Sequence, residues 1–249
     1  MSGHSKWATI KHRKGAVDKA RGKLFARVLR QVEVAAREGG GDMEGNPTLR
    51  SMYQKARDAS VPTDTIERAI KRGTGELEGV RYEPVTYEGY APNGVAVYVE
   101  CLTDNRNRTG ADVRAIFSKN GGSSAEPGAV AWQFQRKGVL MAKKAGDDDE
   151  FMLLALEAGA EDLDDQGDLW QVTTAPTDLA KVRSALDEAG IVVEGSDLTM
   201  LPTTTVLLES EANARKVLKV IDALEEQDDV QAVYANFDIP EEILSLVSA

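Results

Sequence analysis

Apolar residues in the first third of the chain recur every three or four positions, which is the spacing of one face of an amphipathic helix. The first stripe consists of Leu24, Val28, Val32 and Ala35. The second consists of Leu49, Met52, Tyr53 and Ala56, and the third of Ile66, Ala69 and Ile70. The pattern predicts three helices that together form a small helical domain.

Residues with capping propensity mark the ends of these helices. Asn46 followed by Pro47 offers an N-cap and a proline at the first helical position. Asp64 with Glu67 resembles a capping box at the start of the third helix. Gly73 is placed to end that helix.

After a linker at residues 73–79 the period changes from helical to alternating, which is typical of half-buried strands. Val85 and Tyr87 lead into a turn at residues 91–94, and alternation resumes at 95–101, so a β-hairpin is expected. The elements expected next are a polar junction at 103–109, a helix that ends at Asn120, and a strand at Ala129–Phe134.

From residue 138 onward, short strands alternate with helices. We expect strands at 138–142, 169–173, 191–194, 204–208 and 230–234, and helices at 148–158, 178–189 and 211–224. A short helix over a few short strands is typical of ferredoxin-like split βαβ domains, so the fold class is α+β. The acidic run at 147–150 is interpreted as a helix cap and not as a metal site, since acids favour a helix start.

Charge is distributed unevenly along this pattern. Residues 1–37 contain ten basic and two acidic residues, a net charge of +8, while the whole chain carries −11, which leaves −19 for residues 38–249. A basic head on an acidic body is polarised, and the head is the part that can hold a polyanion.

The first helix presents its cations on the side opposite the apolar stripe. At about 100° per residue, these are Lys19, Lys23, Arg27, Arg30 and Arg37. Such a face is either solvated or a phosphate-binding surface. The segment before it supplies further cations, hydroxyls and one aromatic ring that can stack on a base: His4, Ser5, Lys6, Trp7, Lys11, His12, Arg13 and Lys14. A basic arm that leads into a basic helix face favours nucleic-acid binding.

A second candidate contact lies at the 103–109 junction. Backbone amides at a helix start attract anions, and the polar side chains there are Asn105, Arg106, Asn107, Arg108 and Arg114. The alternative is that these arginines pair with acids of the same acidic domain.

The sequence offers few signatures of a catalytic or cofactor-binding site. The sequence contains no P-loop, no dinucleotide-type glycine fingerprint and no nucleophile elbow, and Cys101, its one cysteine, lies in a strand-like run where burial is expected. We therefore predict no catalytic residue, no metal site and no cofactor. No run approaches the ~20 apolar residues of a membrane helix, and the basic N-terminus does not resemble a signal peptide, so a cytoplasmic protein without a membrane partner is expected.

Several motifs in order resemble the YebC/PmpR family. They are Met1–Trp7 continuing into Ile10–Lys14, Thr103–Thr109, Leu198–Pro202 and Val233–Pro240. The resemblance covers essentially the whole chain. One loop departs from it, because a glycine-rich turn ending in Gly-Ser-Val is replaced here by Ser123–Val130, with Ala125, Pro127 and Ala129.

The resemblance implies a small N-terminal helical domain followed by two ferredoxin-like α/β domains, one inserted in the other. The implied boundaries are 1–75, then 80–134 together with 204–240, and 135–203 for the insertion. It also implies a non-enzymatic, DNA-binding transcriptional regulator.

The alternative within the family is a ribosome-associated translation factor that binds ribosomal RNA and relieves stalls at proline-rich stretches. More distant hypotheses are a metal-dependent phosphoesterase, because acids are abundant, and a protein-interaction adaptor whose acidic domains dock on basic partners.

Overall fold

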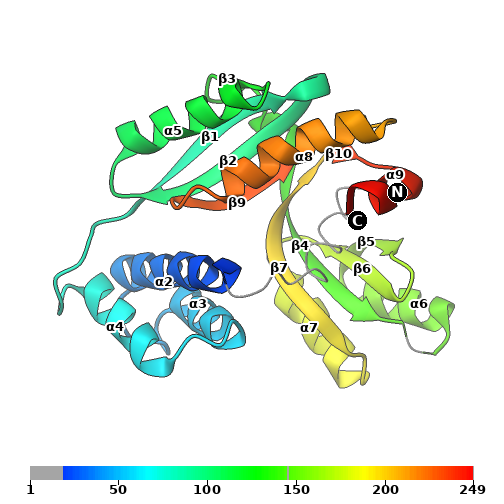
Figure 1. The fold of residues 1–249 in the computed structure, drawn as a ribbon. Helices are drawn as coiled ribbons and strands as arrows, with labels where there is room; N and C mark the ends of the chain where they lie inside the picture. Colours follow the sequence, from blue (N-terminus) through cyan, green and yellow to red (C-terminus); the bar gives the residue numbers. More distant parts are fainter. Residues whose placement is uncertain (1–18, 145, 249) are drawn as a thin grey trace.

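The computed structural model of the protein describes residues 19–144 and 146–248, and Figure 1 shows three bodies along the chain. Helices α2, α3 and α4 form the helical domain at one corner. A sheet covered by α5 and α8 lies above it in this view, and a second sheet covered by α6 and α7 lies at the lower right. The predicted α+β fold class is confirmed.

The helical domain consists of α2 (Lys19–Gly39), α3 (Pro47–Asp58) and α4 (Thr63–Thr74). The predicted apolar stripes supply its core, in which Val32, Leu49 and Ile66 are fully buried. The predicted cap is confirmed, since the Asn46 side chain accepts a hydrogen bond from the Leu49 amide at 3.0 Å.

The other two predicted helix boundaries are wrong. Helix α4 begins after Pro62, without a side-chain cap, so Asp64 and Glu67 do not form a capping box. It continues past Gly73 to Thr74 and ends at Gly75, whose φ of +83° lies in the left-handed region that glycine tolerates. Gly73 is instead buried against α2, where an added Cβ would lie 2.4 Å from the Glu33 carbonyl oxygen.

The first sheet has the strand order β3-β1-β2-β9, with β1 and β2 forming the predicted hairpin. Its strands are β1 (Glu83–Ala91), β2 (Val95–Thr103), β3 (Ser123–Ala125) and β9 (Val230–Ala235), and its helices are α5 (Arg106–Lys119) and α8 (Glu211–Glu225). The short helix η1 (Pro92–Gly94) joins β1 to β2. Alternate β2 side chains pack with Phe117 of α5 and Val217 of α8 in one core.

The predicted strand at 129–134 is wrong. Residues Ala131–Gln133 form the short helix η2, because the buried Glu88 carboxylate accepts the amides of Gly128, Val130 and Ala131 at 2.6–2.8 Å. These amides are therefore unavailable to a strand ladder. The atypical loop is thus held by a carboxylate of β1.

The second sheet has the order β5-β6-β4-β7. Its elements are β4 (Phe134–Lys143), α6 (Asp148–Ala158), β5 (Ala160–Asp165), β6 (Leu169–Thr174), α7 (Leu179–Glu188) and β7 (Val193–Pro202). The predicted cap in the acidic run is confirmed, because the Asp147 carboxylate caps α6 by accepting the Asp149 amide at 2.9 Å.

The chain then returns to the first sheet. Strands β8 (Val206–Leu207) and β10 (Phe237–Asp238) pair in parallel, β9 pairs with β2, and α9 (Glu241–Ser248) follows. This path agrees with one domain being inserted in another, although the exact domain boundaries stay a prediction. None of the helices in 19–144 and 146–248 is long and apolar enough to cross a membrane.

Candidate nucleic-acid interface

The basic side chains of α2 contact the end of α8 and the loop that leads to β9, which lie above α2 in Figure 1. Lys23 donates to the Glu226 carbonyl at 2.6 Å, and Arg30 donates to the Asp228 carbonyl at 2.5 Å. Arg27 donates to the carbonyl of Glu225. Residues 225–229 are called the acceptor segment below.

The acceptor segment attracts cations because it lies at the C-terminal end of α8. The last carbonyls of a helix have no partner within the helix, and they carry the negative end of its dipole. Arg27 and Lys23 bind the carbonyls of Glu225 and Glu226 at this helix end, and Arg30 binds the Asp228 carbonyl just beyond it. Burial in the contact lowers the pKa of Arg27, although the charges of Glu225 and Asp228 act in the opposite direction. Lys23, Arg27 and Arg30 therefore each have a protein acceptor in this structure.

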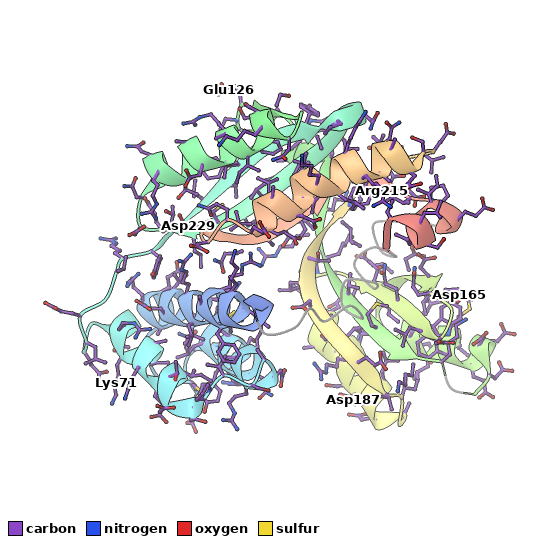
Figure 2. All side chains as sticks on the ribbon, viewed as in Figure 1. Lys71, Glu126, Asp165, Asp187, Arg215 and Asp229 are labelled. Carbon is purple, nitrogen blue, oxygen red and sulfur yellow. The ribbon has the colours of Figure 1, made fainter. Side chains whose placement is uncertain are left out.

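Asp229 links both predicted basic regions. Its carboxylate accepts bonds from Arg30 at 3.2 Å, Arg108 at 3.2 Å and the Thr109 hydroxyl at 2.7 Å, and Figure 2 places it between α2 and the first sheet. Burial by itself would raise the pKa of Asp229, but the bonds from Thr109 and Arg108 and the charges of Arg30 and Arg108 give a net lowered pKa. Asp229 is thus an anion at the joint between the domains.

The junction at 103–109 forms a helix start held largely by its own acids. The Asn105 side chain caps α5 by accepting the Arg108 amide at 3.1 Å, and Arg108 also pairs with Asp104 at 2.6 Å. Arg106 pairs with Glu83 at 3.7 Å. Arg106 and Arg108 therefore both pair with acidic residues of their own domain, which was the alternative to phosphate binding. The remaining two predicted residues, Asn107 and Arg114, are exposed.

Arg37 contacts the segment between α4 and β1, residues 75–82, which is the linker in the structure. It donates to the carbonyls of Val80 at 3.3 Å and Tyr82 at 3.5 Å. Its neighbour Glu33 is buried and pairs with Arg72 at 3.1 Å. The Arg37 bonds fasten this segment to α2, and the Glu33–Arg72 pair joins α2 to α4.

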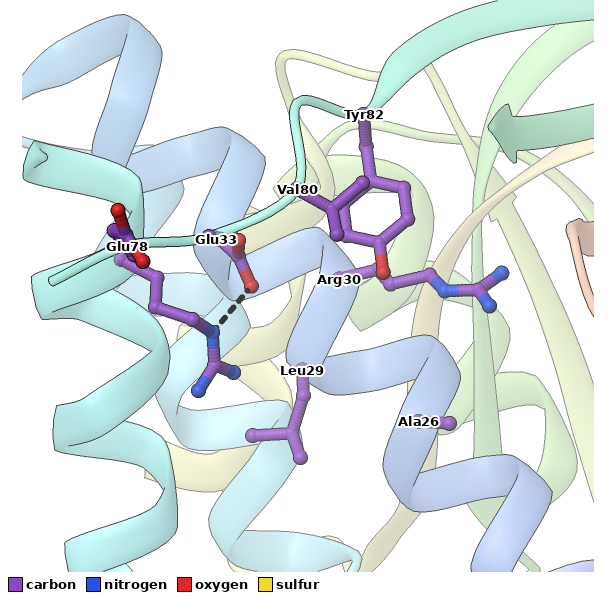
Figure 3. A pocket seen from close by; sticks show the side chains of 9 residues that line it. Ala26, Leu29, Arg30, Glu33, Glu78, Val80 and Tyr82 are labelled. Carbon is purple, nitrogen blue, oxygen red and sulfur yellow. Dashed lines mark hydrogen bonds and ion pairs between the residues drawn. The ribbon is translucent and has the colours of Figure 1, made fainter. Parts of the chain in front are cut away.

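A cavity of about 720 Å³ lies where the linker leaves the helical domain (Figure 3). The Arg30 guanidinium lies there over the Tyr82 ring, 5.0 Å from its centroid. Glu33 and Arg72 line the same space, so carboxylate and guanidinium balance each other in it. The cavity adjoins the linker and has no excess of one charge.

Part of the predicted interface lies outside the described residues. This applies to the whole arm, namely His4, Ser5, Lys6, Trp7, Lys11, His12, Arg13 and Lys14. Lys19 is the first residue of α2, and nothing is described of its side chain. Nucleic-acid binding by all seventeen predicted residues stays a prediction.

Sequence reasoning missed the acceptor segment and Glu33. The periodicity of a helix shows which side chains share a face but not what that face contacts, so it did not indicate a protein partner for the basic face of α2. The available signal was the run Glu225-Glu226-Gln227-Asp228-Asp229, an anionic counterpart to the basic helix at the end of another helix.

Cys101 is buried as predicted, and burial together with the nearby charges of Asp229 and Glu100 raises its pKa to about 12. Within residues 19–144 and 146–248, no group of three or more His, Cys, Asp and Glu side chains is arranged to hold a metal ion.

Comparisons with known proteins match the whole length of the chain. The family described as "TACO1/YebC protein N-terminal domain" matches residues 5–76, and "TACO1/YebC second and third domain" matches residues 82–237. A "Probable transcriptional regulatory protein" of Rubrobacter xylanophilus is 57% identical over 250 residues, covering 100% of both chains. A protein of the same name from Halothermothrix orenii is 53% identical over 251 residues, covering 100% of this chain and 99% of the relative.

A solved structure has the same fold. The crystal structure of a conserved hypothetical protein from Aquifex aeolicus superimposes with a TM-score of 0.84 at 47% identity, covering 96% of this chain and 99% of that chain.

Proposed function

This chain belongs to the TACO1/YebC family, and from that premise we propose that it is a non-enzymatic nucleic-acid-binding regulator of gene expression, with DNA as its target and transcription as its output. Relatives named as probable transcriptional regulatory proteins support transcription. The observation that carries the proposal is the row of α2 cations, each of which already binds an oxygen acceptor.

The row has the geometry of a phosphate contact. Lys23, Arg27 and Arg30 are spaced by four and three residues, so they lie on one side of α2 along about 10 Å of its length. Their present partners are oxygens. Cations in such a row bind a sugar-phosphate backbone without reading its sequence.

Two further groups extend this surface in the proposal. The basic arm precedes α2 in the sequence and adds cations and Trp7. Asn107 and Arg114 are exposed on α5 and provide a separate contact. The protein has no membrane partner in this proposal and acts in the cytoplasm.

A direct competition tests the choice of polymer, because phosphate contacts are common to DNA and RNA. Labelled protein is offered purified ribosomes and an excess of mixed-sequence duplex DNA at physiological salt, followed by sedimentation. Retention on DNA is the expected result. Pelleting with ribosomes despite the DNA would make the protein a translation factor that binds ribosomal RNA.

The electrostatic basis has its own test. With ~6 phosphate contacts, log K against log salt should fall with a slope of about −5 on duplex DNA. A slope of zero would end the proposal. Cleavage of the DNA in Mg²⁺ or Mn²⁺ would favour the phosphoesterase hypothesis, and intact DNA is expected.

A further inference from the structure

The contact between α2 and the acceptor segment resembles the contact that α2 would make with nucleic acid. Backbone carbonyl oxygens at the end of α8 and in the loop after it bind three cations that are predicted to bind phosphate oxygens. Ammonium and guanidinium groups have several N–H donors, but the acceptor segment lies directly against the face of α2 that carries them, so it and a sugar-phosphate backbone would compete for the same space. Binding of nucleic acid at this face therefore requires the acceptor segment to leave it.

The joint itself is polar, which makes separation feasible. The core of the helical domain consists of side chains from α2, α3 and α4 and the segments between them. Among the described residues, no hydrophobic cluster combines these side chains with those of the first sheet. Polar interfaces of this kind are typical of domains that move relative to one another.

Opening the joint leaves no buried charge without a partner. Asp229 would lose Arg30 but would keep Arg108, Thr109 and Thr103, the last at 3.3 Å. The α2 cations would pass from carbonyl oxygens to phosphate oxygens. The usual cost of breaking a buried ion pair is therefore avoided.

The segment that joins the two bodies can act as a hinge. Residues 75–82 run from the end of α4 to β1 without regular structure, and they include Gly75 in the left-handed conformation and Gly79. Arg37 holds the end of this segment to α2, so rotation would take place around that attachment. The cavity at the linker borders the same segment.

We propose that residues 225–229 are an internal substitute for the nucleic-acid backbone, which occupies Lys23, Arg27 and Arg30 in the free protein and is displaced when nucleic acid binds. The helical domain then turns on the 75–82 segment. This inference rests on the proposed function, and it adds that the closed form described here excludes nucleic acid from α2.

The test locks the closed form without removing a cation. Gln31 on α2 donates to Gln231 on β9 at 3.3 Å across the joint, and both side chains are uncharged. The double variant Gln31→Cys, Gln231→Cys is treated with a short bismaleimide, and the matched control is the same variant treated with N-ethylmaleimide. Cys101 does not compete, because it is buried and its raised pKa disfavours the thiolate.

The cross-linked protein should bind duplex DNA at least about tenfold more weakly, and its salt slope should fall from about −5 to about −2, because ~3 phosphate contacts are lost. The control should bind within about twofold of wild type, an affinity difference below 0.5 kcal/mol. Equal affinity of the cross-linked and control proteins would overturn the proposal. Failure of the bismaleimide to join the two cysteines would also overturn it, since the closed form would then not be populated.

Failure of the proposed function gives a different result. In that case wild type, control and cross-linked protein all fail to bind DNA or ribosomes. A wild type that binds, together with a cross-linked protein that binds equally well, refutes only the displacement.

Discussion

The first sheet contacts its two neighbours in chemically different ways. Toward the second sheet, Phe134 and Met200 pack with Tyr98 and Tyr234 around buried Val130, and the Tyr98 and Phe134 rings lie 6.1 Å apart. Toward the helical domain, ammonium and guanidinium groups of α2 donate to backbone carbonyls and to the Asp229 carboxylate. An apolar joint holds only when water is excluded, whereas a polar joint exchanges its partners for water or phosphate at small net cost. The difference indicates one fixed joint and one separable joint.

The largest expected effect comes from the apolar joint. Phe134→Ala should lower the free energy of unfolding by about 3–5 kcal/mol, since a buried ring is replaced by a cavity. Denaturant titration measures it. Phe134→Leu keeps most of the volume and serves as the control, with a smaller loss. If both substitutions change stability by less than 1 kcal/mol, the joint between the sheets is not a packed core.

Asp229 should give the next largest effect. Asp229→Ala leaves Thr109, Thr103 and Arg108 without their shared acceptor, and we expect a loss of about 2–4 kcal/mol. Asp229→Asn keeps the size and one acceptor oxygen and should cost less. If Asp229→Ala weakened only the contact with Arg30 of α2, and Thr103, Arg108 and Thr109 were unaffected, the network shared through Asp229 would be contradicted.

The pH dependence of the same residue has a definite sign. The folded-state pKa of Asp229 is lowered, so its unfolded carboxyl binds protons first as the pH falls. Its contribution to stability is present above the unfolded pKa of about 3.9 and is lost as the pH falls through the folded pKa. Wild type should therefore lose its advantage over Asp229→Asn below about pH 4, as followed by denaturant titrations from pH 7 to pH 3. An advantage that is constant across this range would contradict the prediction.

Helix periodicity and local capping could be predicted from the sequence, because both depend on neighbouring residues. The stripes of α2, α3 and α4 and the caps at Asn46 and Asp147 are examples. Strand β5 was missed because its acidic residues obscure the alternation of apolar and polar positions. Residues 129–134 were predicted as a strand because the carboxylate that accepts the amides of this loop, Glu88, lies about 40 residues earlier in the sequence.

The partner of a polar face depends on distant residues, which periodicity does not contain. Lys23 donates to the carbonyl of Glu226, 203 positions away, although α2 and α8, the helices in or next to which the two residues lie, were both predicted. The candidate cations were thus identified while their contacts were not. Helix α9 was missed altogether, although it follows directly after the motif Val233–Pro240.

Removing the α2 cations should act mainly on binding. Lys23→Gln, Arg27→Gln and Arg30→Gln together should reduce the salt slope on duplex DNA by ~3, through the loss of three phosphate contacts. Folding should change little, since these side chains lie outside the helical core. The matched control, Lys181→Gln, Lys216→Gln and Lys219→Gln, makes the same charge change at exposed positions elsewhere. Equal slopes for the two variants would refute a specific role of α2.

The smallest expected effect lies at the glutamine pair of the polar joint. Gln31→Ala removes one uncharged contact to Gln231, and Gln31 Oε1 is buried without a hydrogen-bond donor among the described residues. Stability should change by less than about 0.5 kcal/mol, while the affinity for DNA should rise by about twofold because the closed form is weakened. Weaker binding by this variant would indicate that the glutamines belong to the DNA-binding surface.

The most direct measurement is the distance across the polar joint with and without nucleic acid. Spin labels on Ser51→Cys in α3 and Ser118→Cys in α5 report it by pulsed dipolar spectroscopy, since both serines are exposed and Cys101 is buried. The account predicts one distance population in the free protein and a second population that grows in proportion to bound DNA. A saturated complex with the distance distribution of the free protein would contradict it.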